Sequence, residues 1–425
     1  MIKPTRLIFF FTAVLFTHSL FAATGVERNA NDRDDVLREW VNTKRQITVK
    51  ELGGALSITG EVHGEMQSFN EKRNGIRQRG PGGELGIAEY VYDAEVSMLF
   101  DYRADRTWSA VKIKYDNDAG TISGRTDAIK LDRAYLGARL RDADTFTVDL
   151  EIGRRSLGNI FDSKVEFSSL FDGILLKYDL ASEKAGDFYA HAGVFLVNER
   201  RSQYAYVAEL GMMRIANSNF YTKYSIIDWD TKDDTNIGHT FAKTYKNNFE
   251  FVISQLIFGY RWTPVKFKKT VEFYLAGVYN HAAHKKTENN ITNGKRANAA
   301  TYAGFTMGEL KKKNDWSLDV NYQVVQAQAV ADYDSSGIGL GNSLGSGFYW
   351  VLNPSPGPGS GPFIPATRKT AEGNVNFRGY MITLQYLITN NLNLFQTFSQ
   401  SITLDTNIGP FRQYKMYELD MIYIW

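Results

Sequence analysis

Cysteine is absent from the 425-residue sequence, so disulfide bridges, thiolate metal sites and thiol catalysis are excluded. After the first 22 residues, no stretch approaches the roughly 20 apolar residues that a membrane-spanning helix needs. An excess of one charge is also missing, because 49 basic side chains face 47 acidic ones. A nucleic-acid partner is therefore not expected, since such proteins carry a strongly basic face. What the chain does have is 24 tyrosines and 27 phenylalanines in a sequence that is polar on average, which suits strands with a single apolar face.

The first 22 residues have the pattern of a secretory signal peptide. Lys3 and Arg6 form a charged start, and the apolar run Leu7–Phe16 is too short to cross a bilayer. Small residues follow, and we expect cleavage after Ala22. The alternative is an N-terminal membrane anchor, which the short apolar run disfavours. Residues 1–22 are therefore predicted to direct export.

Residues 23–54 differ in composition from the rest of the chain. The charged stretch Asp32–Lys44 has apolar residues at helical spacing, which indicates a short helix or a periplasmic extension. A disordered leader is the alternative. The apolar positions are Val36, Leu37, Trp40 and Val41.

From residue 55 onward the chain is a succession of segments in which apolar and polar side chains alternate. Successive side chains of a strand point to opposite faces, so each segment predicts a strand with one apolar face. We expect sixteen strands, at Ala55–Phe69, Tyr90–Arg103, Thr107–Asn117, Ile129–Arg141, Thr145–Arg155, Gly173–Ala181, Asp187–Val197, Gln203–Ile215, Asn219–Asp228, Asn248–Trp262, Thr270–His281, Thr301–Leu310, Asp315–Tyr333, Asn376–Thr389, Leu392–Leu404 and Gln413–Trp425.

The lengths of the connections give a second signal. Short turns follow the even-numbered segments, and the long connections mostly follow odd-numbered ones. This parity is typical of an antiparallel membrane barrel with short periplasmic turns and long external loops, whereas a soluble sandwich has no reason to keep it. We therefore predict an all-β fold, a transmembrane β-barrel over residues 55–425. Its longest external loop, rich in glycine and proline, is expected at residues 334–375.

The face of each strand follows from its charges. In Tyr90–Arg103 the tyrosines and apolar residues share one face, and Asp93 and Glu95 share the other. A cation at mid-depth on a lipid-exposed face would cost about 2–4 kcal/mol, so the charged faces are predicted to point into a wet lumen. The predicted pore-lining wall is Asp93, Glu95, Lys112, Lys114, Arg133, Arg139, Arg141, Asp149, Glu151 and Arg155. The alternative is that these charges are merely solvated in a wide lumen, with no single residue mattering.

The segment Gln413–Trp425 resembles the C-terminal strand of bacterial outer-membrane proteins. Tyr417, Leu419 and Met421 alternate with acidic residues, and the chain ends on an aromatic residue with a tyrosine two places before. The resemblance implies that Tyr423 and Trp425 form an assembly signal read by the barrel-assembly machinery. An ordinary half-buried strand is the alternative.

The signal peptide, strand rhythm, loop order and last strand together resemble the sixteen-stranded outer-membrane porins, which are usually trimeric diffusion channels. The resemblance implies that the third long connection, residues 158–172, folds into the barrel as a constriction loop. Its charged residues are Asp162, Lys164 and Glu166, although the lysine departs from the acidic pattern of the family. The acids are then expected to face the arginines at 133, 139, 141 and 155.

Opposed acids and bases across a narrow aqueous gap create a transverse field that favours small polar solutes. The leading hypothesis is therefore passive diffusion of small hydrophilic solutes and ions through an outer-membrane homotrimer. A substrate-selective, anion-preferring porin and a non-conducting surface barrel acting as an adhesin or structural envelope protein are the alternatives. We predict no enzymatic activity, catalytic residues, cofactor or metal. A hydrolase would need an oriented Ser/His pair, and His281 and His284 fall on opposite faces of a strand.

Overall fold

The computed structural model describes residues 54–84, 86–118, 126–182, 185–199, 202–230, 250–264, 269–285, 294–331, 334–339, 350–352, 363–365 and 374–425. The predicted signal peptide and the helix expected at Asp32–Lys44 lie outside these residues.

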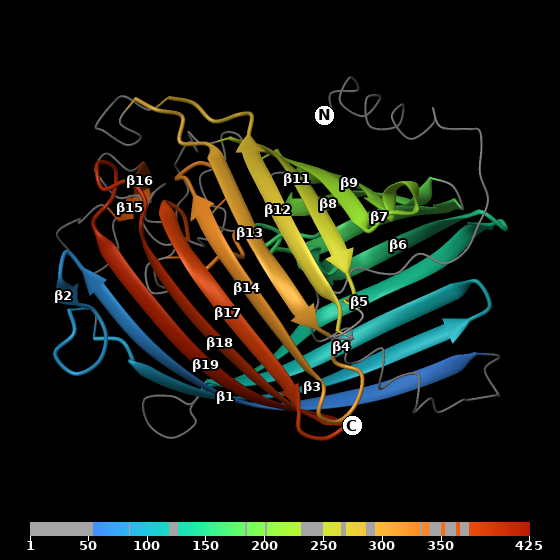
Figure 1. Ribbon diagram of the computed structural model, residues 1–425, viewed down its shortest axis with the longest axis horizontal. Helices are drawn as coiled ribbons and strands as arrows, with labels where there is room; N and C mark the ends of the chain where they lie inside the picture. Colours follow the sequence, from blue (N-terminus) through green and yellow to red (C-terminus); the bar gives the residue numbers. More distant parts are fainter. Residues whose placement is uncertain are drawn as a thin grey trace.

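Sixteen antiparallel strands close into one barrel, which confirms the predicted fold and strand number (Figure 1). All sixteen overlap the segments expected from the sequence. They are β1 (Ala55–Arg73), β3 (Tyr90–Ala104), β4 (Thr107–Asp118), β5 (Thr126–Asp142), β6 (Phe146–Ser156), β7 (Leu170–Ser182), β8 (Gly186–Asn198), β9 (Gln203–Met213), β10 (Phe220–Trp229), β11 (Phe251–Trp262), β12 (Val271–Asn280), β13 (Ala299–Gly308), β14 (Trp316–Val325), β17 (Phe377–Leu387), β18 (Leu392–Thr403) and β19 (Arg412–Ile424).

Three further strands are short and lie outside the barrel wall. The two-residue β2 (Ile76–Arg77) pairs with the end of β1. The hairpin of β15 (Trp350–Leu352) and β16 (Phe363–Pro365) lies within the connection between β14 and β17. The helical turns η2 (Leu157–Asn159) and η4 (Ile215–Asn217) are single 3-10 turns. No helix in the described ranges has the length and apolar character needed to cross a membrane.

The barrel closes where β19 pairs with β1, from Ile424 opposite Glu61 to Arg412 opposite Arg73. Beyond the last pair, Trp425 and Gly60 exchange two backbone hydrogen bonds of 2.9 Å. The indole of Trp425 lies directly over Gly60, with ring atoms 2.2 Å from the place that a Cβ would take. Any larger residue at position 60 would therefore displace this ring.

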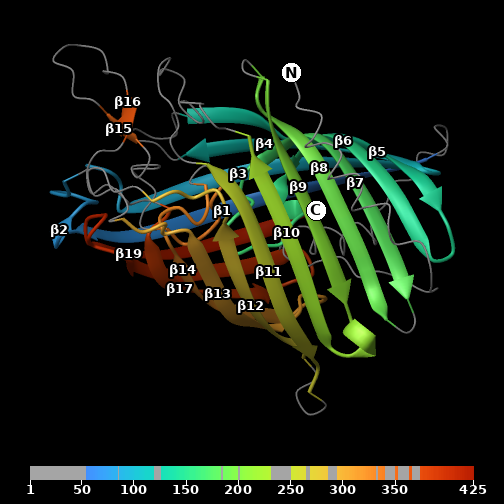
Figure 2. The ribbon, with the colours of Figure 1, turned by 90° about the horizontal axis from the view of Figure 1, so that it is seen from above.

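The connections separate by length between the two ends of the barrel. Short turns join β3 to β4, β5 to β6 and β17 to β18 at what we call the turn end. The connections after β1, β6, β10, β12 and β14 lie at the opposite end, the loop end, at the upper left of Figure 1. We call residues 157–169 loop 3 and residues 326–376 loop 7, after their order at this end. Figure 2 shows the wall from β7 to β12, on the far side from β17–β19.

Loop 7 begins earlier than the sequence indicates. The strand expected over Asp315–Tyr333 ends at Val325, and the run that follows it is buried inside the barrel rather than paired in the wall. A short apolar run has the same local signature as a buried strand, and this explains the difference.

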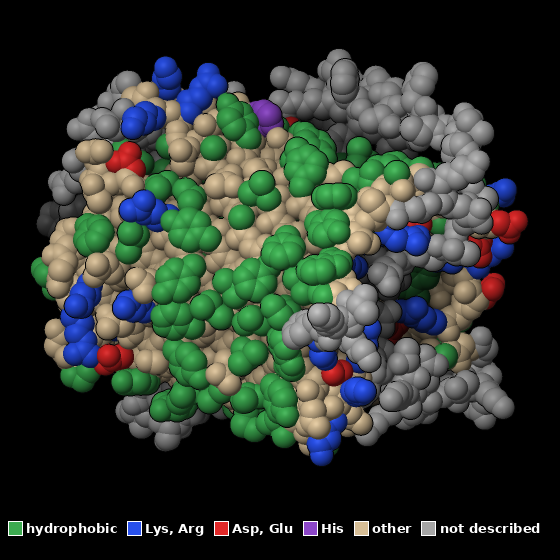
Figure 3. All heavy atoms as spheres, viewed as in Figure 1, with side chains coloured by type: hydrophobic (Ala, Val, Ile, Leu, Met, Phe, Trp, Pro, Cys, Tyr) green, Lys and Arg blue, Asp and Glu red, His purple; other side chains and the backbone are tan. Residues whose placement is uncertain are grey.

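The outward face of the barrel is apolar. Large hydrophobic side chains remain exposed there, including Leu136, Leu210, Phe258 and Leu275, each more than half exposed. In Figure 3, hydrophobic side chains cover the face of the barrel formed by β12–β14 and β17–β19. A continuous apolar surface of this extent is not stable in water and is typical of strands that face hydrocarbon. Tyr423 and Trp425 belong to this face.

Candidate functional site

The inner surface of the barrel divides into two sectors of different chemistry. The sector made by β19, β1 and β3–β7 carries a succession of ion pairs, and we call it the ionic wall. The residues that alternate with these charged side chains are apolar and exposed on the outer face. Since successive side chains of a strand point to opposite faces, the charged side chains point into the barrel. The paired members are Glu61, His63, Glu95, Lys112, Lys114, Arg139, Asp149, Glu151, Arg155, Lys177 and Asp420.

At the seam, where β19 pairs with β1, ion pairs connect side chains of β19, β1 and β4. His63 Nδ1 lies 3.2 Å from Asp420 Oδ2 on β19. The ring also lies 3.6 Å from Glu61, the next inward residue along β1. Glu61 is 2% exposed, accepts a hydrogen bond from Ser97 at 2.5 Å and contacts Lys112 Nζ at 3.3 Å. A buried carboxylate is stable only with such partners, so this network fixes the side chains of the seam.

Glu151 on β6 is a second acid of the ionic wall with three partners. It forms ion pairs with Arg155 and with Lys177 on β7, the latter at 2.9 Å. Its Oε1 also accepts a hydrogen bond of 3.1 Å from the indole N–H of Trp108. The guanidinium of Arg155 stacks 4.2 Å above the ring of Tyr135. Two cations meet one carboxylate here, and Asp149 lies opposite Lys177 in the β6–β7 register.

Water reaches other parts of the ionic wall. Arg139 forms a two-point ion pair with Asp149, at 2.9 and 3.2 Å, yet 36% of its side chain is exposed. Lys114 lies 2.5 Å from Glu95 and keeps 27% of its side chain exposed. Charged groups that are both paired and partly wet indicate a solvent-filled space inside the barrel.

The remaining predicted wall residues differ in exposure. Arg133 is 7% exposed, and its position opposite Lys112 in the β4–β5 register places it on the inner face. Asp93 is half-buried at the loop end of β3. Arg141 lies beyond a β-bulge near the end of β5 and is exposed.

Loop 3 turns into the barrel instead of extending from its end. Its two ends are adjacent, since the N–H of Leu157 donates to the carbonyl of Ser169 at 2.8 Å. Between them, Phe161, Val165 and Phe167 are each at most 2% exposed. Apolar side chains at such burial need a packed environment, which the interior of the barrel supplies.

The charged tip of loop 3 reaches the wall opposite the ionic wall. Asp162 forms an ion pair of 2.5 Å with Lys223 on β10, and both groups are buried. Lys164 Nζ lies 3.2 Å from Asp319 on β14. Between these two pairs, the hydroxyl of Ser163 donates to Gln255 on β11 at 2.8 Å. Loop 3 is thereby attached to three strands across the barrel.

Loop 7 is hydrogen-bonded to the second half of loop 3, residues 166–169. The carboxylate of Asp334 accepts hydrogen bonds from the N–H groups of Phe167, at 3.2 Å, and Ser169, at 3.0 Å. Ser336 donates its hydroxyl to the carbonyl of Glu166 at 2.8 Å. Phe167 has φ of 74°, a left-handed conformation that is costly for a bulky residue, so these contacts maintain a strained turn.

Two acidic side chains at the contact between loop 3 and loop 7 are buried. Glu166 is 2% exposed, and neither of its carboxylate oxygens has a hydrogen-bond partner among the described residues. Burial raises the pKa of Glu166 well above its ordinary value, and the nearby carboxylates of Asp334 and Glu209 raise it further. Burial also raises the pKa of Asp334 to about 7, despite its hydrogen bonds to backbone N–H groups. The junction therefore favours neutral carboxyl groups.

Around the two loops lies a second sector, which we call the apolar core. It joins loop 3 and loop 7 to the inner faces of β7–β14 and to the first residue of β17, near the loop end. The cluster includes Leu157, Phe161, Val165, Phe167, Phe195, Val207, Ile227, Trp229, Phe251, Ile253, Ala327, Val330, Ala331 and Phe377. Apolar residues on an inner wall are explained by the loops that cover them.

The structure brings together only part of the predicted site. The loop residues Asp162 and Glu166 do not lie against the arginines at 133, 139, 141 and 155 as the resemblance implied. They contact β10 and loop 7 instead, on the other side of the interior. The partners Lys223 and Asp319 were not predicted, because nothing in their local sequence marks them. The apolar residues between the loop acids were the available sign of a buried loop.

No group of three or more metal-binding side chains occurs within the described ranges. His281 accepts or donates a hydrogen bond with Ser254 at 2.6 Å, but both groups are exposed on the outer face near the loop end. No third group that would orient this pair is hydrogen-bonded to it among the described residues.

A closed barrel of sixteen antiparallel strands is the architecture of the outer-membrane porins. OprB of Pseudomonas putida, in its high-pH structure, shares 12% identity and has a TM-score of 0.51, with 91% of this chain and 97% of OprB covered. OmpF of Salmonella typhi, in complex with daunomycin, shares 10% identity over 90% of this chain and 100% of its own, with a TM-score of 0.46.

The outer-membrane channel DcaP of Acinetobacter baumannii shares 11% identity over 88% of this chain and 98% of its own, with a TM-score of 0.45. At these identities the likeness to OprB shows the fold alone. No protein-family model matches the sequence, and no curated protein matches it.

Proposed function

We propose that the protein is an outer-membrane porin, a passive diffusion channel for small hydrophilic solutes and ions. The observation that carries this proposal is the ionic wall. Ion pairs that remain partly exposed line the inner face of a barrel whose outer face is apolar. Charges arranged in this way require water inside and hydrocarbon outside. The proposal assigns the protein no catalytic activity and no cofactor.

The membrane setting follows from the same reasoning. We place the barrel in the bacterial outer membrane after removal of residues 1–22, with the turn end in the periplasm and the loop end outside. The C-terminal strand, with Tyr423 and Trp425, is proposed to be the signal for the barrel-assembly machinery. A homotrimer is proposed from the resemblance to porins.

The solute path is proposed to follow the ionic wall. Loop 3 and loop 7 occupy the interior beside β7–β14, so the wet side chains are on β1 and β3–β7. In this arrangement loop 3 narrows the channel from one side. The residues proposed to line the path are Asp93, Glu95, Lys112, Lys114, Arg133, Arg139, Asp149, Glu151 and Arg155. Arg141 is left out, because beyond the β-bulge it is opposite Val148 on the outward face.

A preference for anions is the second candidate. Around Glu151 the cations Arg155 and Lys177 outnumber the acid, and Arg133 adds a further positive charge to the same wall. The pairs Arg139–Asp149 and Lys114–Glu95 are balanced, which limits the preference. We therefore expect weak selectivity for anions.

Planar-bilayer recording of the purified mature protein tests both candidates. Ohmic conductance in KCl supports the porin function, and the reversal potential in a KCl gradient gives the anion/cation permeability ratio. Block by a micromolar carboxylate or phosphate solute would favour a substrate-selective channel. A folded, heat-modifiable barrel with no conductance would contradict the proposal and leave an adhesin or structural role.

A further inference from the structure

Two β-bulges decide which side chains of β5 point into the barrel. The register with β4 shifts next to Lys112, and the register with β6 shifts between Arg139 and Arg141. Before the first bulge the odd-numbered side chains point outward, as the 46% exposure of Leu131 shows. Between the bulges they point inward, where Arg139 is opposite the inward Asp149. Bulges redirect side chains in this way and are common beside functional sites.

Between the bulges, the inward residue Gly137 leaves room for an aromatic ring. Gly137 is opposite Trp108 on β4 and opposite Glu151 on β6. The indole of Trp108 lies over the glycine, with ring atoms 2.2 Å from the place that a Cβ would take. Its N–H donates to Glu151 Oε1 at 3.1 Å, so the ring crosses β5 along the wall. Any side chain at position 137 would displace the indole.

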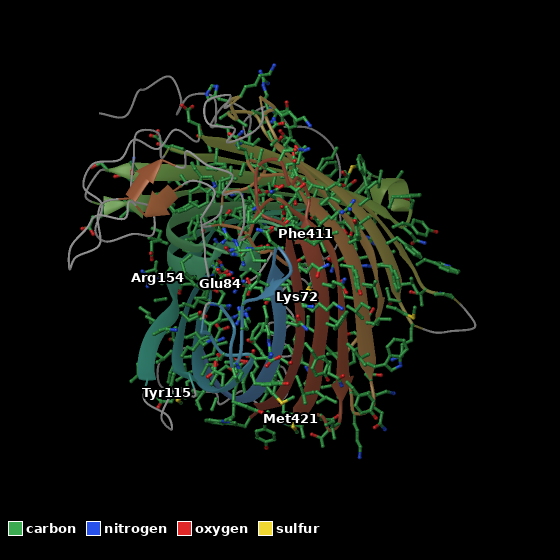
Figure 4. The ribbon with its side chains drawn as sticks, turned by 90° about the vertical axis from the view of Figure 1, so that its left-hand side faces the viewer. Lys72, Glu84, Tyr115, Arg154, Phe411 and Met421 are labelled. Atoms are coloured by element: carbon green, nitrogen blue, oxygen red, sulfur yellow. The ribbon has the colours of Figure 1, made fainter. Side chains whose placement is uncertain are left out.

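The second face of the Trp108 indole points into the lumen. Its first face lies on the backbone of β5, yet the side chain is only half-buried. Trp108 is not among the side chains of the apolar core that surround loop 3 and loop 7. Figure 4 shows this part of the wall at the left, where it labels Tyr115 on β4 and Arg154 on β6, the strands that flank β5. An aromatic face in contact with water is a surface on which a second ring can stack.

Arg139 borders the indole on the side of the turn end. It is the next inward residue of β5 after Gly137, so the two positions are about 7 Å apart. The Nε and Nη2 atoms of Arg139 donate to Asp149 at 2.9 and 3.2 Å, whereas Nη1 has no hydrogen-bond acceptor within the described ranges. The carboxylate of Asp142 lies 3.6 Å from Nη1. Since 36% of the Arg139 side chain is exposed, Nη1 can donate to a solute.

We propose that Trp108 and Arg139 form a binding site for aromatic carboxylates on the solute path. The ring of the solute lies on the indole, and its carboxylate accepts a hydrogen bond from Nη1 of Arg139. A carboxylate bonded directly to a ring, with a hydrogen bond of about 2.8 Å to a guanidinium, matches the separation of about 7 Å between the two positions. The proposal rests on the proposed channel function, because the site faces the lumen.

The probe is benzoate, with acetate as a carboxylate that lacks a ring and benzamide as a ring that lacks the charge. Isothermal titration calorimetry measures binding to the full mature protein in detergent, and block of the bilayer current is recorded separately. Benzoate is expected to bind the wild type about tenfold more tightly than acetate or benzamide, because only benzoate uses both groups of the site. Equal affinities for benzoate and acetate would overturn the proposal.

Trp108→Leu tests the contact with the ring. It is expected to weaken benzoate binding about fivefold and to leave acetate binding unchanged, because only the ring loses a stacking partner. Trp262→Leu, which removes an exposed indole from the outward face, is the matched control and is expected to change neither affinity. Equal losses in the two variants would contradict the proposal. If Trp108→Leu does not fold, as judged by heat-modifiable mobility, Trp108→Phe is expected to lose about twofold for benzoate alone.

Arg139→Gln tests the contact with the carboxylate. It is expected to weaken benzoate binding about tenfold and to change benzamide binding little, because only the carboxylate forms a charge-assisted hydrogen bond. Asp142→Asn removes the acid beside Nη1 and is expected to tighten benzoate binding about twofold, whereas weaker binding would overturn the assignment of Nη1. Conductance in KCl is recorded in parallel. A conducting channel without a preference for benzoate contradicts the site alone, and a barrel that binds benzoate without conducting contradicts the channel function alone.

Discussion

The ionic wall and the apolar core occupy the same cylinder and are held by different forces. Two pairs of the ionic wall, Arg139–Asp149 and Lys114–Glu95, are partly wet, and solvent-exposed ion pairs of this kind typically contribute at most about 1 kcal/mol each. The apolar core buries whole aromatic side chains, such as Phe161 and Phe167, whose rings lie 5.4 Å apart. Burial on that scale stabilises far more strongly. The difference indicates that loop 3 is fixed by packing, while the charges opposite it remain available to act on solutes.

Among the variants considered, removal of the tip of loop 3 is expected to change the conductance of the channel most. Leu157 and Ser169 are already hydrogen-bonded, so a short glycine linker can replace residues 159–167 without straining the wall. The interior beside the ionic wall should widen, and we expect the single-channel conductance to rise about twofold or more. Bilayer recording measures it. Unchanged conductance in a folded barrel would show that the solute path does not pass loop 3.

Truncating the apolar core should loosen loop 3 while leaving the wall folded. Phe161→Ala removes a ring that is 1% exposed, and a buried truncation of this type costs about 3–5 kcal/mol. We expect faster proteolysis and hydrogen exchange of loop 3, with more current fluctuations. Phe258→Ala, on the outward face, is the matched control and should leave loop 3 protected. Equal effects of the two variants would show that the core does not hold the loop.

The contact between loop 3 and loop 7 should weaken as pH rises. The pKa of Asp334 is raised to about 7 in the folded protein, above the ordinary value near 4. For an acid, this shift means that the stability present at low pH is lost as pH rises from about 4 through about 7. Glu166, which faces Asp334 and Glu209, shifts in the same direction.

We therefore expect more frequent loop 3 fluctuations at pH 8.5 than at pH 5.5. The double variant Asp334→Asn/Glu166→Gln should respond little over this range. Noise analysis of bilayer currents at several pH values measures the effect. A wild-type channel that becomes noisier toward low pH would contradict the sign of this prediction.

Single charges of the ionic wall are expected to have the smallest effect. Glu151→Gln leaves Arg155 and Lys177 with a neutral partner, so the anion/cation permeability ratio should rise by about twofold. Arg139→Ala removes a partly wet cation and should lower the ratio by a similar factor. Reversal potentials in a KCl gradient give both values. If neither ratio moves, the ionic wall does not border the solute path.

The sequence predicted the wall well where only one face of a strand is apolar. In β3, Asp93 and Glu95 alternate with exposed tyrosines, and the structure places the acids inside. In β11 the sequence does not show which face points inward, because Phe251 and Ile253 face inward while Phe258 faces outward. Both faces of that strand are apolar for different reasons. One meets the loops and the other forms the outer belt, so periodicity alone could not distinguish them.

The contacts of loop 3 could not be predicted from the sequence either. Asp162 and Lys164 find their partners on β10 and β14, and no local pattern connects these distant segments. The buried run that includes Ala327 and Val330 was assigned to a strand, since a segment packed under a loop has the same composition as a strand core.

The seam between β1 and β19 imposes an order on how the barrel is completed. One edge of β1 has no partner until the most distant strand in the chain arrives, while β3 can pair with its other edge early. Such long-range pairing is slow, and an unpaired edge readily recruits other chains. Until Trp425 covers Gly60, the free edge of β1 therefore remains able to pair with other chains.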